Sequence, residues 1–240
     1  MEDTMKAGHY ENRKESVEIM INSSRDIINE LIGYGVDFAT KDGELDYTRE
    51  GAHSKPRILF HEDITGKEIT STLLDVVRKL ENVTIMEYVT MTDIIEKDNV
   101  CYGVLAKDAN NNEMCIKAGY TIFACGGIGG LYDHSTNYPH LTGDAIAIAI
   151  QHGIKLENVQ IHPTTLYTKK RGRAFLISES VRGEGARLYG KDGNRFANEV
   201  LPRDIMTQKI REQMKKDDMP YVWMDMTVLG EEVIKNHFPH

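Results

Sequence analysis

The sequence has no long apolar run and few cysteines. Its longest strongly apolar stretch, residues 145–150, is far shorter than the roughly 20 residues that span a bilayer. Residues 1–25 are polar and contain no signal-peptide core, so we expect no membrane association. The three cysteines, Cys101, Cys115 and Cys125, are odd in number and lack CxxC spacing. A disulfide framework and a metal site are therefore not expected, and a reducing cytoplasm is the expected compartment.

The sequence also lacks an excess of positive charge. It carries 29 Lys and Arg against 37 Asp and Glu, a net charge of −8, so it has no general basic field to attract nucleic acid or anionic lipid. With 40% hydrophobic and 28% charged residues, the composition is that of a globular protein. A length of 240 residues allows two unequal domains, and we place their boundary near residue 160, giving 1–159 and 160–240.

Hydrophobic periodicity predicts four helices. Apolar residues recur at helical intervals over residues 10–33, and Gly33 and Gly35 follow as stop signals. Thr65 and Glu68 have the spacing of a capping box that would open a helix running to about residue 81. A third helix is expected over residues 142–152, buried nearly all round and ended by Gly153, and a fourth from Pro202 to about residue 216.

Short β-prone runs separated by turn residues predict strands over 83–87, 100–107, 113–118 and 120–124, with another near 221–226. The run at 120–124 reads as a buried strand and continues into a glycine cluster at 126–130. A strand that ends in glycines is where an α/β sheet often brings its backbone close to a ligand. We therefore predict a mixed α/β fold.

Few residues indicate chemistry by pattern alone. The sequence contains no G-x-G-x-x-G, the usual dinucleotide fingerprint, and a lone glycine cluster is more often a turn. His162 is more often a structural histidine than a ligand. The segment 178–185 offers acids around Arg182, and its pattern favours a solvated charge run over a proton relay. Arg203 follows Pro202 at a helix start, where the dipole disfavours a cation unless an anion compensates; Asp204 could be that anion.

Taken together, these segments resemble the L-aspartate oxidases, members of the fumarate reductase and succinate dehydrogenase flavoprotein superfamily. The resemblance runs over essentially the whole chain, and its motifs are Thr-Arg-Glu-Gly-Ala-His-Ser at 48–54, Gly-Ile-Gly-Gly-Leu-Tyr at 127–132, Thr-Gly-Asp at 142–144, Gln-Ile-His-Pro-Thr at 160–164, Ser-Glu-Ser-Val-Arg-Gly-Glu-Gly at 178–185, Gly-Asn-Arg-Phe at 193–196 and Pro-Arg-Asp at 202–204. Two positions depart from the family pattern: Ala52 stands where glycine is usual, and Cys125 where threonine is common.

The resemblance implies FAD-dependent oxidation of L-aspartate to iminoaspartate in NAD biosynthesis, with oxygen or fumarate as electron acceptor. It implies that His162 binds a substrate carboxylate, that Gln160 lines the site, and that Arg203 orients the substrate. Glu179 and Arg182 match a proton pathway that ends at Arg203. Family accounts give this arginine an acid/base role, although a guanidinium holds its proton to above pH 12. An iminoaspartate-consuming enzyme is the partner that the family implies.

Glu50 carries the expected choice of substrate. The resemblance implies that its carboxylate meets the ammonium of aspartate, which fumarate and succinate lack. The same resemblance places FAD contacts at Thr90, Met91, Gly126, Gly127 and Asp144. Two alternatives remain open: a fumarate reductase or succinate dehydrogenase flavoprotein, against which Glu50 argues, and a non-catalytic binding or assembly module.

The resemblance also implies an internal fragment. By comparison with the family, the glycine fingerprint would precede Met1, and a second histidine and arginine of the substrate site would follow His240. The expected fold is then the middle of a Rossmann-like FAD-binding domain, residues 1–159, followed by most of a capping domain of the fumarate reductase flavoprotein type, residues 160–240.

Overall fold

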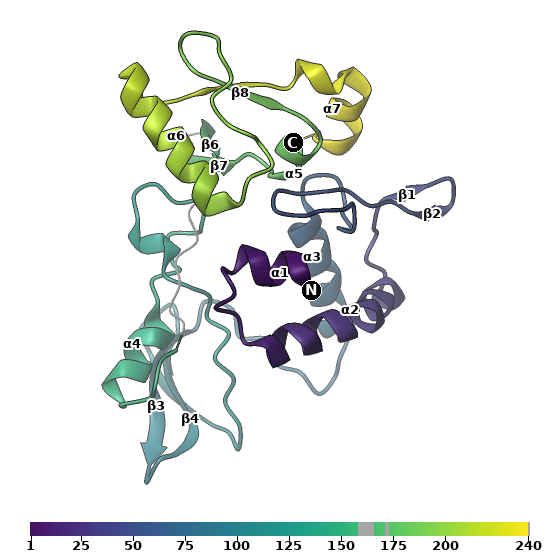
Figure 1. Ribbon diagram of the computed structural model, residues 1–240. Helices are drawn as coiled ribbons and strands as arrows, with labels where there is room; N and C mark the ends of the chain where they lie inside the picture. The colour runs from purple at the N-terminus through teal and green to yellow at the C-terminus, as the bar shows by residue number, and fades with distance from the viewer. Residues whose placement is uncertain (158–165, 171–172, 240) are drawn as a thin grey trace. The chain divides into compact units, whose positions relative to one another are not determined.

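The computed structural model describes residues 1–157, 166–170 and 173–239 (Figure 1). The chain divides into two compact units, one formed mainly by residues 1–83 and 176–239 and the other mainly by residues 84–157. Helices and strands occur in both units, which confirms the mixed α/β class. The first unit takes residues from both sides of position 160, and the domain boundary there stays a prediction.

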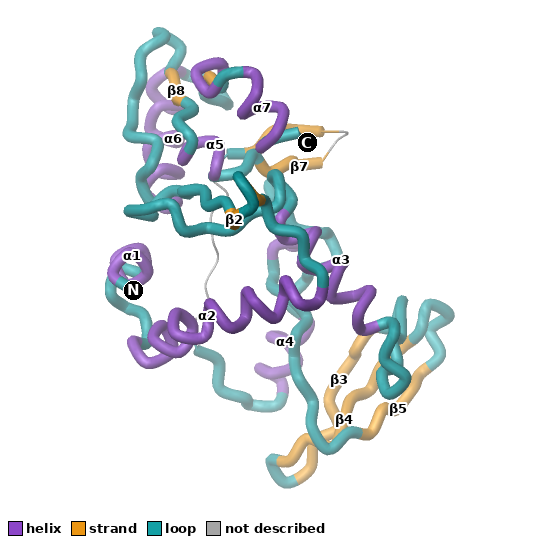
Figure 2. The backbone as a smooth tube through the Cα atoms, turned by 90° about the vertical axis from the view of Figure 1, so that its right-hand side faces the viewer, coloured by secondary structure: helices purple, strands orange, loops and turns teal. Residues whose placement is uncertain are grey.

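Three helices form the N-terminal part of the first unit: α1 (Glu2–Ala7), α2 (Lys14–Tyr34) and α3 (Thr65–Val77). Helix α2 confirms the helix predicted over 10–33, and it ends at Gly35, whose φ of 100° is left-handed and suits glycine. It packs against α3 (Figure 2). Between them lies a short hairpin of β1 (Thr40–Lys41) and β2 (Glu44–Leu45) in a segment otherwise without regular structure, as predicted.

The capping box predicted at Thr65 is wrong. Ile64 is the N-cap residue of α3, and the Thr65 hydroxyl instead accepts a hydrogen bond from the His61 main-chain N–H at 3.0 Å. The Glu68 carboxylate accepts from the N–H of Asp37 at 3.1 Å. Both side chains are therefore bonded to the preceding loop, which competes with the local cap that their spacing suggested.

The C-terminal part of the first unit surrounds a core of Leu188, Met206 and Ile210. Strands β8 (Arg187–Tyr189) and β9 (Trp223–Asp225) pair antiparallel, and β9 lies within the predicted strand at 221–226. Helix α6 (Arg203–Asp217) begins after Pro202 as predicted. The remaining elements there are the α-helices α5 (Ser180–Gly183) and α7 (Glu231–His237) and the short helix η2 (Thr227–Leu229). Strands β6 (Tyr167–Lys170) and β7 (Arg173–Leu176) pair with each other, and most of β7 belongs to the second unit.

The second unit is built on a three-stranded antiparallel meander of β3 (Thr90–Lys97), β4 (Val100–Lys107) and β5 (Glu113–Lys117). Strands β4 and β5 confirm the predictions at 100–107 and 113–118, whereas β3 was not predicted. Helix α4 (Asp144–Gln151) contacts β3 and is followed by Gly153, as predicted. His152, just after it, bonds to the Asp93 carboxylate of β3 at 2.7 Å. A short helix, η1 (Gly129–Leu131), follows the first glycines of the cluster.

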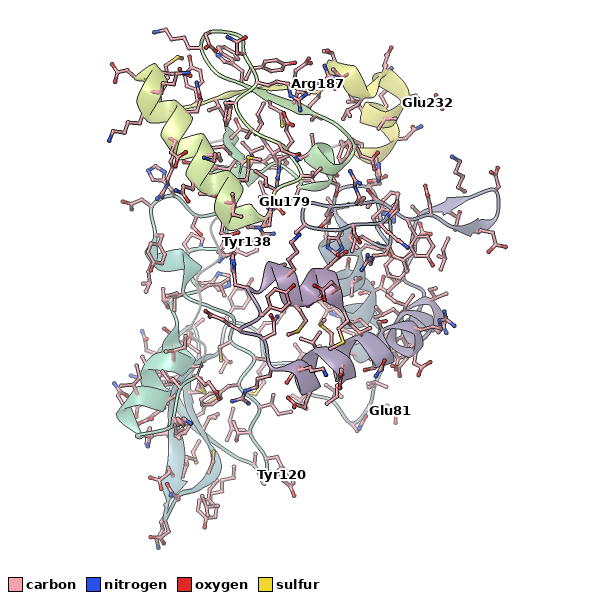
Figure 3. The ribbon with its side chains drawn as sticks, viewed as in Figure 1. Glu81, Tyr120, Tyr138, Glu179, Arg187 and Glu232 are labelled. Atoms are coloured by element: carbon pink, nitrogen blue, oxygen red, sulfur yellow. The ribbon has the colours of Figure 1, made fainter. Side chains whose placement is uncertain are left out.

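Two strand predictions are wrong, and burial of α4 is only partial. Residues 83–87 and 120–124 form no strand. Tyr120, labelled in Figure 3, is 95% exposed and Ile122 is 88% exposed. A strand requires a neighbour to pair with its main chain, and the described residues supply none to either run. On α4, Ala145, Ile148 and Ala149 are buried, but Ile150 is exposed. Within the described part of the chain, no helix has both the length and the apolar character to cross a bilayer.

Candidate active site

Glu179 joins two arginines that are separated along the sequence. One carboxylate oxygen accepts a hydrogen bond from Nε of Arg203 at 2.7 Å, and the other lies 3.5 Å from Nη2 of Arg182. Glu179 is the N-cap residue of α5 and Arg203 the first residue of α6, so the two helix starts meet at this carboxylate (Figure 3). Arg182, Glu179 and Arg203, the three residues predicted to form a proton pathway, thus form one continuous ion-pair chain.

The burial of this ion-pair chain changes from one end to the other. The side chain of Arg182 is 1% exposed, that of Glu179 is 14% exposed, and that of Arg203 is 45% exposed. Ser180 and Val181 are buried as well. The interpretation of residues 178–185 as a solvated charge run is therefore wrong, because α5 lies inside the unit. The ion-pair chain therefore leads from the buried guanidinium of Arg182 to that of Arg203, which solvent or a ligand can reach.

Arg182 is held largely by main-chain oxygens. Its Nη1 donates to the carbonyl oxygens of Glu199 and Leu201, but Nε and Nη2 form no hydrogen bond with any residue that the structure describes. Burial lowers the pKa of Arg182 from its ordinary value, although the nearby Glu179 carboxylate opposes this shift. Incomplete pairing of a buried cation is costly, and residues held in this way are frequent in functional sites.

The cation at the start of α6 is compensated by Glu179 and not by its neighbour Asp204. The Asp204 carboxylate instead accepts a hydrogen bond from Nε2 of His9 at 3.0 Å. Burial raises the pKa of Asp204, but the His9 hydrogen bond and main-chain N–H groups outweigh it and leave the pKa lowered. Because Asp204 is occupied by His9, Arg203 has a single carboxylate partner, Glu179, among the described residues.

The loop that carries Glu50 is fixed against α5. Gly183 approaches the Arg49 carbonyl oxygen so closely that any Cβ at this position would collide with it. The buried Thr48 donates its hydroxyl hydrogen to the Glu184 carboxylate at 2.7 Å. Oε1 of Glu50 accepts a hydrogen bond from the Ser180 hydroxyl at 3.4 Å. Glu50 therefore lies beside the same short helix that carries Arg182.

Ala52 closes this loop in a left-handed conformation. Its φ is 66°, a region that costs an L-residue with a Cβ about 1 to 2 kcal/mol and suits glycine. The Ala52 N–H donates to the Val200 carbonyl oxygen at 3.1 Å, which holds the strained residue in place. This conformation gives a physical reason for glycine at this position in the family, and it makes Ala52 a strained substitute.

The second unit contains the residues predicted to contact FAD. Thr90 and Met91 are the first two residues of β3, and Asp144 is the first residue of α4, where its carboxylate accepts from the Thr142 hydroxyl at 2.7 Å. Gly126 has a φ of 74°, and a Cβ on Gly127 would meet open space. A cavity of about 340 Å³ adjoins Gly126. It is lined by Phe123, Ala124, Cys125, Gly126, Ala145, Ile146, Ala149, Ile154 and Leu156.

The lining of this cavity is compatible with one end of a dinucleotide. An apolar wall with nearby glycine backbone suits the adenosine of FAD, which needs ring contacts and close main-chain approach. The glycine-rich turn that usually holds the pyrophosphate is not present in the sequence. The residues present therefore fit part of the cofactor.

Two predicted site residues, Gln160 and His162, lie outside the described residues. Conversely, sequence reasoning missed three residues that the structure brings to the site. Ser180 contacts Glu50, Glu199 binds Arg182 through its main chain, and His9 holds Asp204. Only Ser180 lies within a recognised motif, and its sequence separation of 130 residues from Glu50 gives no local signal of their contact.

Comparison with known proteins identifies the family of the chain. A family model described as an FAD binding domain matches residues 1–240, so the chain belongs to this family of FAD-binding flavoprotein domains. FAD is the cofactor of the family. More particularly, the chain is similar to the L-aspartate oxidases of Clostridium perfringens and Clostridium acetobutylicum, with 43% identity to each over the whole chain. The chain spans about half the length of these curated relatives, 55% and 56%.

Solved structures agree on the fold. An E. coli quinol fumarate reductase structure is similar with a TM-score of 0.86 and 25% identity, covering 99% of this chain and 45% of that chain. A quinol-fumarate reductase solved with menaquinol molecules gives a TM-score of 0.77 and 27% identity, covering 88% of this chain and 41% of that one. The prediction of a fumarate reductase flavoprotein type of fold is confirmed.

Proposed function

We propose that this chain forms part of an FAD-dependent L-aspartate oxidase that produces iminoaspartate in NAD biosynthesis, with oxygen or fumarate as acceptor. The observation that carries the proposal is the ion-pair chain from buried Arg182 through Glu179 to Arg203, with Glu50 beside the same helix. The similarity to L-aspartate oxidases supports the choice of reaction. A cytoplasmic location and an iminoaspartate-consuming partner belong to the same proposal.

The two ends of aspartate require different partners. Arg203 is half-exposed and has a planar guanidinium, which can hold a substrate carboxylate by two parallel hydrogen bonds. His162 and Gln160 are proposed to line the same site. Glu50 would accept a hydrogen bond from the substrate ammonium, and a bare carboxylate there would repel fumarate or succinate.

Glu179 links Arg203 to the unit's interior and is proposed to relay protons. Burial lowers the pKa of Arg182, and the ion pair with the Glu179 carboxylate opposes this shift. FAD, when bound, supplies the redox chemistry by accepting the electron pair from the substrate. We propose that Thr90, Met91, Gly126, Gly127 and Asp144 help hold it. The protein residues bind and orient the substrate and move protons.

The alternatives differ in testable ways. A fumarate reductase or succinate dehydrogenase flavoprotein has the fold of the similar solved structures but gains nothing from Glu50. A non-catalytic binding module would retain no flavin and show no turnover at any length. We favour the oxidase because a carboxylate at position 50 specifically suits an amino substrate.

Replacing Glu50 by Gln tests the proposal. The experiment uses the full-length form, meaning this chain together with the remaining length that its relatives carry. A charge-assisted hydrogen bond is worth roughly 1.5 to 3 kcal/mol, so kcat/KM for aspartate should fall about 10- to 150-fold. Fumarate reduction should be unchanged or faster, because a repulsive charge has been removed. A parallel loss for both substrates would make Glu50 structural and remove the reason for choosing aspartate.

A further inference from the structure

Ser180 is a buried hydroxyl in the first turn of α5 that contacts Glu50. Ser180 is 8% exposed, and its Oγ donates a hydrogen bond to Oε1 of Glu50 at 3.4 Å. The same Oγ accepts a hydrogen bond from the Ser178 hydroxyl at 3.1 Å. The Ser180 N–H donates back to the Ser178 oxygen at 3.3 Å. Ser178, Ser180 and Glu50 therefore form a short chain of aligned hydrogen bonds, in which each bond polarises the next.

We propose that Ser180 is a positioning residue that orients the Glu50 carboxylate for recognition of the substrate ammonium. This inference rests on the proposed function. The backbone of the Glu50 loop is already fixed by Gly183 and by the Ala52 hydrogen bond to Val200. The side chain of Glu50 can still rotate about its own torsions. Among the described residues, the Ser180 hydroxyl is the single hydrogen-bond donor that limits this rotation.

The choice of a hydroxyl has a chemical reason. An arginine or lysine bonded to Glu50 would fix its carboxylate but would also neutralise it and compete with the substrate ammonium. A neutral hydroxyl can orient one oxygen while leaving the full negative charge. Within the described part of the chain, Glu50 forms no ion pair, although the buried Arg182 lies close enough to interact with it electrostatically. Ser180 thus orients the carboxylate without cancelling the charge that selects aspartate.

The test is a double-mutant cycle between Ser180→Ala and Glu50→Gln in the full-length form. Loss of this long hydrogen bond, worth about 0.5 to 1 kcal/mol, should lower kcat/KM for aspartate about 2- to 5-fold. Fumarate should be unaffected, since it has no ammonium. In the Glu50→Gln background, Ser180→Ala should have almost no further effect on aspartate, because the charge that it orients has gone. Ser180→Thr restores the hydroxyl and should recover activity.

Ser24→Ala is the matched control, since its hydroxyl also donates to an oxygen of a neighbouring residue, the Ile21 carbonyl at 2.7 Å, but on the exposed helix α2. Ser24→Ala should leave kcat/KM unchanged for both aspartate and fumarate. Should Ser180→Ala fail to fold, Ser180→Cys keeps the volume with a weaker donor, and the same split between substrates is expected.

Two failures can be told apart. An equal loss for aspartate and fumarate in Ser180→Ala, or the same loss with and without Glu50, would make Ser180 structural and overturn this inference. If instead Glu50→Gln alone fails to separate the two substrates, the proposed function is at fault.

Discussion

The buried guanidinium of Arg182 donates a hydrogen bond to the main-chain carbonyl oxygen of Glu199. Glu199 is itself buried, and its carboxylate accepts two hydrogen bonds from Arg195 and one from the Leu188 N–H. Burial raises the pKa of Glu199, but the hydrogen bonds from Arg195 and Leu188 outweigh it and keep the pKa lowered. The side chain of Glu199 thus holds in place the carbonyl that binds Arg182.

We expect Glu199→Ala to destabilise the first unit. The variant removes the carboxylate that accepts hydrogen bonds from the Leu188 N–H and from Arg195. The free energy of unfolding should therefore fall by roughly 1.5 to 3 kcal/mol. Chemical denaturation of the 240-residue chain measures it. Glu212→Ala is the control, because its ion pair with Lys209 is exposed and such pairs contribute about 0 to 1 kcal/mol. Equal effects of both variants would contradict the anchoring role.

Arg203→Lys should reduce turnover much more than substrate binding. Lysine keeps the positive charge but not the planar guanidinium, which can bond to Glu179 and to a substrate carboxylate at the same time. Substrate orientation and the proposed proton delivery should therefore both be impaired. In the full-length form we expect kcat to fall about 100-fold, the size of effect that misplacing a reacting group produces. Arg211→Lys, on the exposed surface of the same helix, is the control. A raised KM with unchanged kcat would reduce Arg203 to a binding residue.

Ala52→Gly should stabilise the chain. Glycine adopts a φ of 66° without the steric cost that alanine pays there, and we expect a gain of about 1 kcal/mol. The opposite sign is expected for Ala147→Gly in helix α4, where glycine costs about 1 kcal/mol. Thermal unfolding of the two variants beside the parent chain tests this, and destabilisation by both would show that Ala52 is not strained.

The pairing of His152 with Asp93 should make the second unit sensitive to acid. The His152 hydrogen bond lowers the pKa of Asp93, so the ionised carboxylate favours the folded state. This stabilisation is present above the ordinary aspartate pKa of about 3.9 and is lost as the pH falls through the lower folded value. Asp93→Asn should therefore lower the unfolding temperature at pH 7, and the difference from the parent should shrink as the pH falls below about 3.9 and vanish once the pH is below the folded pKa of Asp93.

Asp98→Asn is the matched control for that experiment. Asp98 lies in the exposed β3–β4 turn with a left-handed φ of 55°, which asparagine also adopts readily. It should change the unfolding temperature little at either pH. A difference for Asp93→Asn that persists unchanged to pH 3 would show that the carboxylate charge is not the cause.

The 240-residue chain, purified alone, should retain no stoichiometric FAD and should not oxidise aspartate. Its apolar cavity beside Gly126 is compatible with one end of the cofactor, but the sequence lacks the G-x-G-x-x-G turn whose amides and helix N-terminus usually bind the pyrophosphate. Absorbance near the flavin band after gel filtration measures retention, with the full-length form as control. A yellow chain with one flavin per molecule would refute this expectation.

Local signals predicted the helices well and the strands less well. Helices α2, α4 and α6 were predictable because their apolar spacing and their Gly or Pro boundaries lie within the same few residues. Strand β3 was missed, since two register shifts, at Met91/Asp93 and Ile94/Glu96, break the alternation on which a strand prediction depends. Residues 120–124 have a strand-like sequence, but strand formation depends on a partner that no local pattern contains.

The candidate site was predictable as residue types but not as contacts. Glu50, Glu179, Arg182 and Arg203 came from motif resemblance, and the structure brings all four together in one unit. That Glu179 and not Asp204 pairs with Arg203 could not be read from the sequence, because the pairing depends on how α5 meets α6. The same holds for His9, which reaches Asp204 across 195 residues.

The close approach of Gly183 to the Arg49 carbonyl has a mechanical consequence. The Glu50 loop and helix α5 are in direct main-chain contact there, and the Thr48–Glu184 and Ser180–Glu50 hydrogen bonds link them on either side. A displacement of the loop is transmitted directly to the helix that carries Arg182. A bulky residue at position 183 would therefore displace both the Glu50 loop and the helix that carries Arg182. The proposed recognition of the substrate ammonium and the proposed proton pathway should then be disturbed together, although residue 183 contacts neither the Glu50 carboxylate nor the substrate.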